Sequence, residues 1–394
     1  MRRDRRESRR GALGGLLALV VVAVAAGCSA DASDPRPDGP EPTGPVASPT
    51  ENASAPWPTT RPAAAGFDPQ RLTALAREAR REASTCFAVV RDGRLVADWS
   101  WQGTDRDDPR EVFSVTKSVA SALVGIAVRE GLLALDDPAA RWIPEWRGTR
   151  SRTVTVRHLL TNTSGRFWST DSDYRDLVGT DDRTGYAVGL RQQHEPGTAW
   201  AYNNAAIQTL DRVLSEASGM PTAEYAEERL FGPLGMVDSQ LTSDSSGEST
   251  NVFFGMQTTC LDLARFGRLY LDGGVVDGRR ILPRSYVEAS VARSGSPLNA
   301  GYGYLWWLNR PGPLRGPADP VDADGQPLSP RSGQLAPGAA DDLFSAQGLG
   351  GQTVLVDPGS DTVVVRLGLL PDSPDLTYTT ADAARVVTEA LRRP

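Results

Sequence analysis

EVFSVTKSVASAL, residues 111–123, contains the only lysine in a chain of 394 residues whose other basic side chains, apart from two histidines, are all arginine. Lys117 follows Ser114 by three positions, and apolar residues recur after Ser114 at helical spacing. Three residues make nearly one turn, so we expect both side chains on one face of a helix over 114–133. Apolar neighbours should remove water from the ammonium and lower its pKa, leaving a neutral amine that can take the serine proton. Arginine could not serve, because it does not lose its proton in a protein. The stretch therefore predicts a nucleophile beside its base.

The patterns on either side of this stretch predict a sheet that both ends of the chain build. Before it, Asp68 can cap a helix that reaches Arg80, and residues 86–101 alternate about Asp92-Gly93, a strong hairpin signal. After it come short helical patterns at residues 154–240 and a longer helix at 261–274. Three strand patterns follow at 302–308, 351–358 and 361–370, and a last helix covers 379–394. We therefore expect an α+β fold with an inserted, mostly helical subdomain at about 131–250. A Pro- and Gly-rich insertion at about 311–340 is long for a structureless loop.

Residues 1–28 have the composition of an export signal. Six arginines within the first ten residues precede an apolar run over 11–26, and small residues lead to Cys28. The Gly-Cys junction resembles a bacterial lipobox, which implies a lipidated Cys28, and residues 8–13 resemble a twin-arginine signal. We expect an exported protein, held by lipid at the outer face of the bacterial cytoplasmic membrane or in the cell envelope, or secreted. An uncleaved anchor helix is the alternative.

Residues 29–66 are rich in Pro, Ala and Ser and should form a disordered tether to a folded domain over 67–394, because they can bury little apolar surface. Residues 1–27 carry six arginines, one Asp and one Glu, so their removal changes the formal net charge from −7 to −11. This acidity argues against binding of nucleic acid by charge. Membrane attachment would depend on the lipid anchor.

Two cysteines and two histidines remain to be explained in the folded domain. An exported location permits a disulfide between Cys86 and Cys260, and two buried free thiols are the equal alternative. No G-x-S-x-G motif occurs, so a Ser-His-Asp triad with His158 or His194 stays open without support from spacing. Two isolated histidines are too few for a typical catalytic zinc site, and we expect no metal and no cofactor.

Five blocks of the sequence occur in the order found in one large family. The blocks are FSVTKSVASALVGIAVREGLLALDDP (113–138), VTVRHLLTNTSG (154–165), EPGTAWAYNNAA (195–206), RLFGPLGMVDS (229–239) and TTCLDLARFG (258–267). They resemble the serine β-lactamase-related hydrolases, which include class C β-lactamases, serine D,D-peptidases, and esterase and 6-aminohexanoate-dimer hydrolase branches. The resemblance spans roughly residues 67–392. It implies an antiparallel sheet flanked by helices, with a helical domain inserted.

The resemblance also implies roles for individual residues. Ser114 would be the nucleophile, Lys117 its base, and Tyr202, in the Y-x-N element, the relay of a proton toward the leaving group. Asn204 of the same element would orient Lys117 or the substrate. Tyr174 resembles a tyrosine of the substrate pocket in the 6-aminohexanoate branch, although a surface-loop tyrosine is an equal interpretation.

The chain departs from the family at the third motif, usually Lys or His, then Thr or Gly, then Gly. Here the corresponding residues are Ala346-Gln347-Gly348, without a cation. In β-lactamases and D,D-peptidases that cation helps to hold the substrate carboxylate, so the pattern is closer to the esterase and 6-aminohexanoate branches. The resemblance implies an oxyanion hole made by the amides of Ser114 and Leu349, with Gln347 and Gly348 in the substrate pocket.

These features favour a serine hydrolase that cleaves ester or amide bonds of a small-molecule or peptide-like substrate through an acyl-enzyme on Ser114. A D,D-carboxypeptidase or β-lactamase is one alternative, with cell-wall peptides or β-lactams as substrates. A non-catalytic binding lipoprotein on the same fold is another. The fold itself does not choose among these functions.

Overall fold

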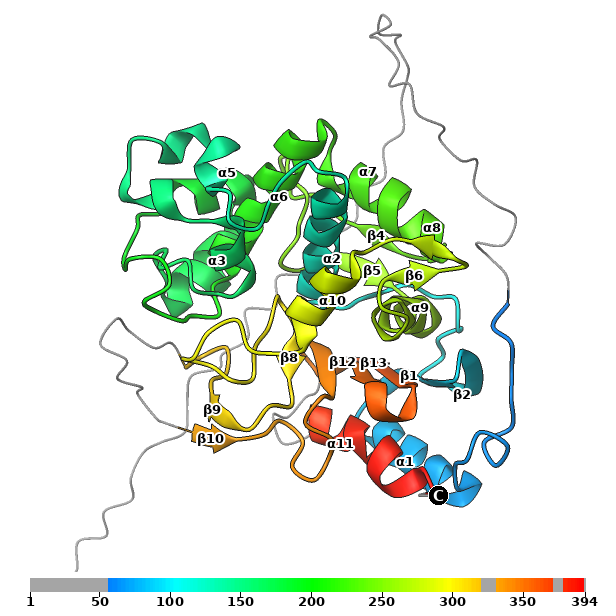
Figure 1. The fold of residues 1–394 in the computed structure, drawn as a ribbon. Helices are drawn as coiled ribbons and strands as arrows, with labels where there is room; N and C mark the ends of the chain where they lie inside the picture. Colours follow the sequence, from blue (N-terminus) through cyan, green and yellow to red (C-terminus); the bar gives the residue numbers. More distant parts are fainter. Residues whose placement is uncertain (1–55, 320–330, 371–377, 393–394) are drawn as a thin grey trace, which may run out of the picture. The chain divides into compact units, whose positions relative to one another are not determined.

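A six-stranded antiparallel sheet lies at the centre of the folded chain (Figure 1). The computed structural model describes residues 56–319, 331–370 and 378–392. The strand order is β2-β1-β13-β12-β11-β8, formed by β1 (Ser84–Arg91), β2 (Arg94–Ser100), β8 (Trp307–Leu308), β11 (Phe344–Gly348), β12 (Gln352–Asp357) and β13 (Thr362–Gly368). The N-terminal strand β1 pairs with the C-terminal strand β13. The predicted α+β fold, with a sheet built from both ends of the chain, is therefore confirmed.

The hairpin of β1 and β2 turns at Asp92 and Gly93, as the sequence predicts. Their φ angles are +48° and +68°, the left-handed conformation that a two-residue hairpin turn needs and that Asp-Gly accepts at low cost. Side chains alternate along β1: Phe87 belongs to the apolar cluster on one face of the sheet, and Ala88 belongs to the larger cluster on the other. Both faces of β1 are consequently buried.

Helices cover both faces of the sheet (Figure 1). α1 (Pro69–Arg81) and α11 (Thr380–Arg385) share an apolar cluster with one face. α9 (Cys260–Leu271) packs on the other face. The Asp68 side chain accepts hydrogen bonds from two amides of the first turn of α1, and so caps this helix as predicted.

The central helix is α2 (Val115–Arg129), and its residues are buried from Val115 to Ala127. It packs against α6 (Asn204–Ser218) and against β11, so it lies between the helical part of the chain and the sheet. The helix ends before the predicted Leu133, because Gly131 adopts a φ of +71° directly after the helix cap.

Short elements make up the rest of the described chain. The other α-helices are α3 (Val156–Leu160), α4 (Leu177–Gly179), α5 (Arg183–Gly189), α7 (Thr222–Ala226), α8 (Gly232–Leu234) and α10 (Arg284–Val291). The 3-10 and π turns are η1 (Ala139–Arg141), η2 (Pro144–Trp146), η3 (Arg150–Thr153), η4 (Ser172–Asp176), η5 (Glu227–Phe231), η6 (Pro358–Ser360) and η8 (Val386–Ala390). The small strands are β3 (Arg110–Glu111), β4 (Gln240–Leu241), β5 (Met256–Thr258), β6 (Val275–Val276) and β7 (Arg279–Arg280).

Residues 56–66 belong to the described structure, although the sequence predicts them to be part of a disordered tether. Thr60 N donates a hydrogen bond to Leu95 O of the edge strand β2, and Leu95 N donates one to Pro58 O. Trp57 packs against the core, with the Arg265 guanidinium over its ring. A single aromatic residue in a segment of small and polar residues therefore accounts for the difference.

The predicted export signal and Cys28, together with residues 29–55 of the predicted tether, lie outside the described residues. Within the described ranges, no helix combines the length and the apolar character that crossing a membrane would require.

The insertion at 311–340 has secondary structure of its own. β9 (Gly312–Leu314) pairs with β10 (Arg331–Gly333) in an antiparallel ribbon. Residues 320–330, between these strands, lie outside the described residues.

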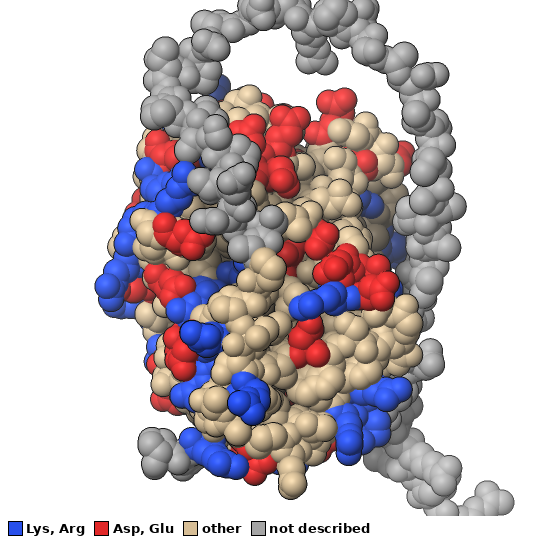
Figure 2. Space-filling view, turned by 90° about the vertical axis from the view of Figure 1, so that its right-hand side faces the viewer, with Lys and Arg blue, Asp and Glu red and all other residues tan. Residues whose placement is uncertain are grey.

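Acidic and basic side chains are interspersed over the face shown in Figure 2. Lys117 is only 1% exposed, so the basic side chains that form this surface are arginines.

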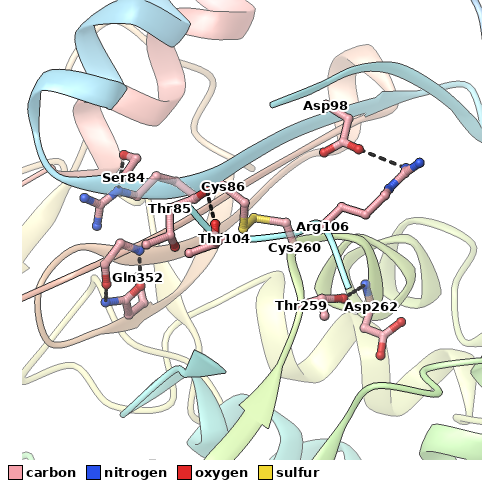
Figure 3. The surroundings of a disulfide bond; sticks show 12 residues. Ser84, Thr85, Cys86, Asp98, Thr104, Arg106, Thr259, Cys260, Asp262 and Gln352 are labelled. Carbon is pink, nitrogen blue, oxygen red and sulfur yellow. Dashed lines mark hydrogen bonds and ion pairs between the residues drawn. A yellow bond between two sulfur atoms is a disulfide. The ribbon is translucent and has the colours of Figure 1, made fainter. Parts of the chain in front are cut away.

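A disulfide joins the sheet to α9 (Figure 3). Cys86 lies in β1, Cys260 is the first residue of α9, and their Cα atoms are 6.2 Å apart. Of the two alternatives for these cysteines, the structure contains the disulfide.

Candidate active site

Ser114 and Lys117 meet at the start of α2. Ser114 directly precedes the helix, and the Lys117 Nζ lies 2.7 Å from the Ser114 Oγ. The Nζ also donates a 2.7 Å hydrogen bond to the backbone carbonyl of Phe253. A neutral amine has two N–H groups and one lone pair, so the carbonyl can hold an N–H while the lone pair faces the serine hydroxyl. The pair therefore has the geometry of a nucleophile and its base.

Burial controls the charge of Lys117. Its Nζ lies 4.8 Å from the centre of the Tyr202 ring and 5.6 Å from that of Phe253. Loss of hydration lowers the pKa of Lys117 to about 7, although the nearby Asp173 carboxylate opposes this shift. A substantial share of the amine is consequently unprotonated near neutral pH, as a general base requires.

Tyr202 completes the group around the Ser114 side chain. Its side chain interacts electrostatically with Ser114, and burial raises the pKa of Tyr202 above its ordinary value, so the hydroxyl keeps its proton. Trp307 stacks on the Tyr202 ring at 5.6 Å, and Tyr302 packs against it edge-on at 5.9 Å. The aromatic neighbours thus hold the ring in one position.

Glu111 holds the backbone that leads into the nucleophile. Phe113 has a φ of +48°, which is strained for a residue other than glycine. The Glu111 Oε1 accepts hydrogen bonds from the amide of Phe113 at 2.8 Å and from that of Gly255 at 2.9 Å. Burial raises the pKa of Glu111, against the effect of these hydrogen bonds. One carboxyl group therefore links the loop before the nucleophile to the segment that carries the carbonyl partner of the lysine.

Asp173 is a second buried carboxyl group at the site. It lies in the π turn η4 and is inaccessible to solvent. Its Oδ2 accepts a 2.6 Å hydrogen bond from the amide of Asn204, and its Oδ1 accepts a 3.2 Å bond from that of Ala205. Burial raises the pKa of Asp173 to about 7, although these amides and Lys117 oppose the shift.

Asn204 and Tyr174 lie next to this carboxyl group. Tyr174 is 45% exposed, but burial of its hydroxyl raises the pKa of Tyr174, and the Asn204 side chain opposes this shift. Within the described ranges, the buried Asn204 Oδ1 has no hydrogen-bond partner, so it is suited to accept a substrate N–H. The partner of Lys117 is the Phe253 carbonyl rather than Asn204.

The end of β11 approaches the loop that precedes the nucleophile. A Cβ at Gly348 would lie 2.2 Å from the backbone carbonyl of Val112, so only glycine fits there. The neighbouring Gln347 does not extend freely, because its Nε2 donates a 3.0 Å hydrogen bond to the Ser345 Oγ.

Leu349 follows this strand end, and its side chain is 53% exposed. In the part of the chain that the structure describes, neither the Leu349 amide nor the Ser114 amide donates to a protein acceptor. Both amides are therefore available to donate hydrogen bonds, as an oxyanion hole requires.

The two histidines form hydrogen bonds with residues other than Ser114. The His158 Nδ1 accepts a hydrogen bond from the Thr155 amide and helps to cap α3, and the His194 amide donates to the Gly165 carbonyl. Neither histidine is hydrogen-bonded to Ser114 among the described residues. Over the same residues, no group of three or more His, Cys, Asp or Glu side chains is placed to hold a metal ion.

The fold agrees with the comparison to known proteins. The family model described as Beta-lactamase matches residues 70–386, so the chain belongs to the β-lactamase family. It is 24% identical to the 6-aminohexanoate-dimer hydrolase of Paenarthrobacter ureafaciens, over 77% of this chain and 76% of that protein. It is 30% identical to Esterase EstB of Burkholderia gladioli, over 44% of this chain and 51% of the esterase. A solved Bacillus anthracis structure, provisionally described as a 6-aminohexanoate-dimer hydrolase, superposes with a TM-score of 0.65 at 20% identity, covering 86% of this chain and 90% of that one.

Three groups of the site were not predicted from the sequence: the Glu111 and Asp173 carboxyl groups and the Phe253 carbonyl. Glu111 opens the stretch that holds the nucleophile, and Asp173 directly precedes Tyr174. An acidic residue within three positions of a candidate site residue was thus the available signal for both. A backbone carbonyl leaves no such signal.

Proposed function

We propose that this protein is a serine hydrolase that cleaves carboxylic ester or amide bonds through an acyl-enzyme on Ser114. The observation that carries the proposal is the 2.7 Å distance between the Lys117 Nζ and the Ser114 Oγ in a buried setting. Membership of the β-lactamase family supports it.

In the proposed reaction, the neutral amine of Lys117 takes the Ser114 proton while the Oγ attacks the substrate carbonyl carbon. The amides of Ser114 and Leu349 donate hydrogen bonds to the oxygen that becomes negative. The proton passes from Lys117 through the Tyr202 hydroxyl to the leaving alcohol or amine as the scissile bond breaks. Water then attacks the acyl group, and its proton returns to the Ser114 oxygen by the same groups as the carboxylic acid leaves.

The third motif supports a proposal for the substrate class. Ala346-Gln347-Gly348 offers no cation to a substrate carboxylate, which supports an ester or amide without a carboxylate at that place over a β-lactam or a D,D-peptide. The similarity to a 6-aminohexanoate-dimer hydrolase and to an esterase points in the same direction.

Intact-mass spectrometry after separate exposure to a fluorophosphonate and to penicillin tests the proposal. We expect a fluorophosphonate adduct on the parent protein and none on the Ser114→Ala variant. A stable penicillin adduct would favour cell-wall peptide or β-lactam chemistry instead. If neither reagent formed an adduct, the binding-lipoprotein alternative would replace the hydrolase.

We further propose that the protein is exported and held in the cell envelope by a lipid on Cys28, on the pattern of residues 1–28. A Cys28→Ser variant should move from the membrane fraction to the soluble fraction. Retention of that variant in the membrane would favour an anchor helix.

A further inference from the structure

The start of α6 is held by two side chains that together satisfy its first three amides. These amides have no partner within the helix. The Asp173 carboxylate accepts from Asn204 and Ala205, and the Asn203 Oδ1 accepts from Ala206 at 2.8 Å. Tyr202 lies directly before this turn, so the position of its hydroxyl depends on how the turn is held.

The surroundings of Asp173 contain one opposing charge. Asp173 interacts electrostatically or by hydrogen bonds with six groups. They are Lys117 of α2, the neighbouring Tyr174, Tyr202 before α6, Trp168, and the amides of Asn204 and Ala205. Within the described residues Asp173 forms no salt bridge, and it is the one carboxylate that acts on Lys117. A charged group that is shielded from solvent and forms no direct ion pair interacts strongly with the nearest opposite charge.

We propose that Asp173 is a positioning residue of this site: its carboxylate holds the first turn of α6, with Tyr202 and Asn204, and its charge stabilises the Lys117 ammonium. Burial lowers the pKa of Lys117 and the charge of Asp173 raises it, so the two effects oppose each other. When Asp173 is ionised, its charge raises the pH above which the amine is free, and the hydrogen bonds of Asp173 help to position Tyr202. The effect of Asp173 on catalysis rests on the proposed function. The electrostatic interaction between Asp173 and Lys117 does not depend on that function.

The lone lysine makes this relation directly measurable. Protein labelled with carbon-13 at the lysine Cε gives a single lysine side-chain NMR signal, whose shift against pH reports the titration of Lys117 alone. We expect Asp173→Asn to lower the midpoint by about one pH unit, because the ammonium loses its opposite charge. The rate of fluorophosphonate labelling should also begin to rise at lower pH, to a lower plateau, because the Asn204 or Ala205 amide loses its acceptor.

Asp211→Asn is the matched control. Asp211 lies in the same helix, is buried, and accepts hydrogen bonds from the Thr184 hydroxyl and the Thr250 amide. It does not act on Lys117, so its neutralisation should leave the midpoint unchanged. A similar shift in both variants would indicate general loosening and overturn the proposal.

An unchanged midpoint in Asp173→Asn would also overturn it. If that variant does not fold, Asp173→Ser removes the same charge and leaves a smaller side chain that can still accept a hydrogen bond from a helix amide. The midpoint of the Lys117 titration is then measured in this variant. A shifted midpoint in a protein that no fluorophosphonate labels would support the electrostatic role and reject the hydrolase, so the two failures are distinguishable.

Discussion

Lys117 combines two properties that no other basic side chain among the described residues offers. It can lose its proton at a pH near 7, and its Nζ is held by a carbonyl in a position facing the Ser114 Oγ. Arginine retains the charge and cannot supply the lone pair. The chemistry at this position therefore depends on the identity of the cation as well as on its charge.

We expect Lys117→Arg to lower the rate of fluorophosphonate labelling by a factor on the order of 10³ or more, because the general base is lost. Arg129→Lys, an exchange between the same two residue types at the end of the same helix, should label like the parent. The rates can be followed by mass spectrometry at pH 7 to 8. Labelling of Lys117→Arg within a few-fold of the parent would exclude lysine as the base.

At the scale of elements, the site depends on how α2 and α6 are joined to the segments beside them. The Glu111 carboxylate ties the strained turn before α2 to Gly255, and the Asp173 carboxylate ties η4 to α6. Both links use a buried carboxyl group whose partners are mainly backbone amides. The catalytic side chains are thus positioned by their neighbours' backbones as much as by their own packing.

We expect Glu111→Ala to reduce the rate of fluorophosphonate labelling about 10-fold or more, because a small displacement of the nucleophile is costly. Glu111→Gln should recover most of the rate, since its Oε1 can still accept from the Phe113 and Gly255 amides. Gln257→Ala removes only the 3.1 Å hydrogen bond to the other carboxylate oxygen, and should label like the parent. Equal rates for Glu111→Ala and the parent would remove Glu111 from the site.

The sequence predicted those parts of the site that local spacing or a family motif determines. Ser114 and Lys117 share one helical face, so three positions of separation suffice to bring them together. The Phe253 carbonyl, in contrast, reaches Lys117 from 136 positions further along the chain. Its place depends on tertiary packing and on a backbone atom that every residue possesses. The same reason applies to Asp173, whose burial no local pattern indicated.

At the scale of the molecule, the hairpin and the C-terminal strands were predicted because their turns and alternation are local signals. A sheet built from both ends of the chain was inferred from economy, and the structure confirms it through the pairing of β1 with β13. Residues 56–66 were wrongly assigned to the disordered tether, because the segment around Trp57 consists mainly of small and polar residues, and the packing of Trp57 on the core has no local signal.

The Cys86–Cys260 disulfide connects chain segments 174 residues apart. We expect the Cys86→Ala, Cys260→Ala double variant to lose about 2–5 kcal/mol of unfolding free energy, because the unfolded chain is no longer cross-linked. Thermal unfolding with and without a reductant provides the measurement: the parent should lose stability on reduction, and the double variant should not respond. Ser114 labelling at 25 °C should persist in the double variant. Two free thiols in the denatured, unreduced parent would rule out the disulfide.

The pairing of β1 with β13 also has a consequence for biosynthesis. The ribosome makes β13 long after β1, so one hydrogen-bonding edge of an apolar strand stays without its partner while the residues between them are translated. Contacts between such distant segments form slowly, and open strand edges favour aggregation. The nascent chain therefore cannot complete its sheet until β13 has been made, and the β1 edge can pair with other strands until then.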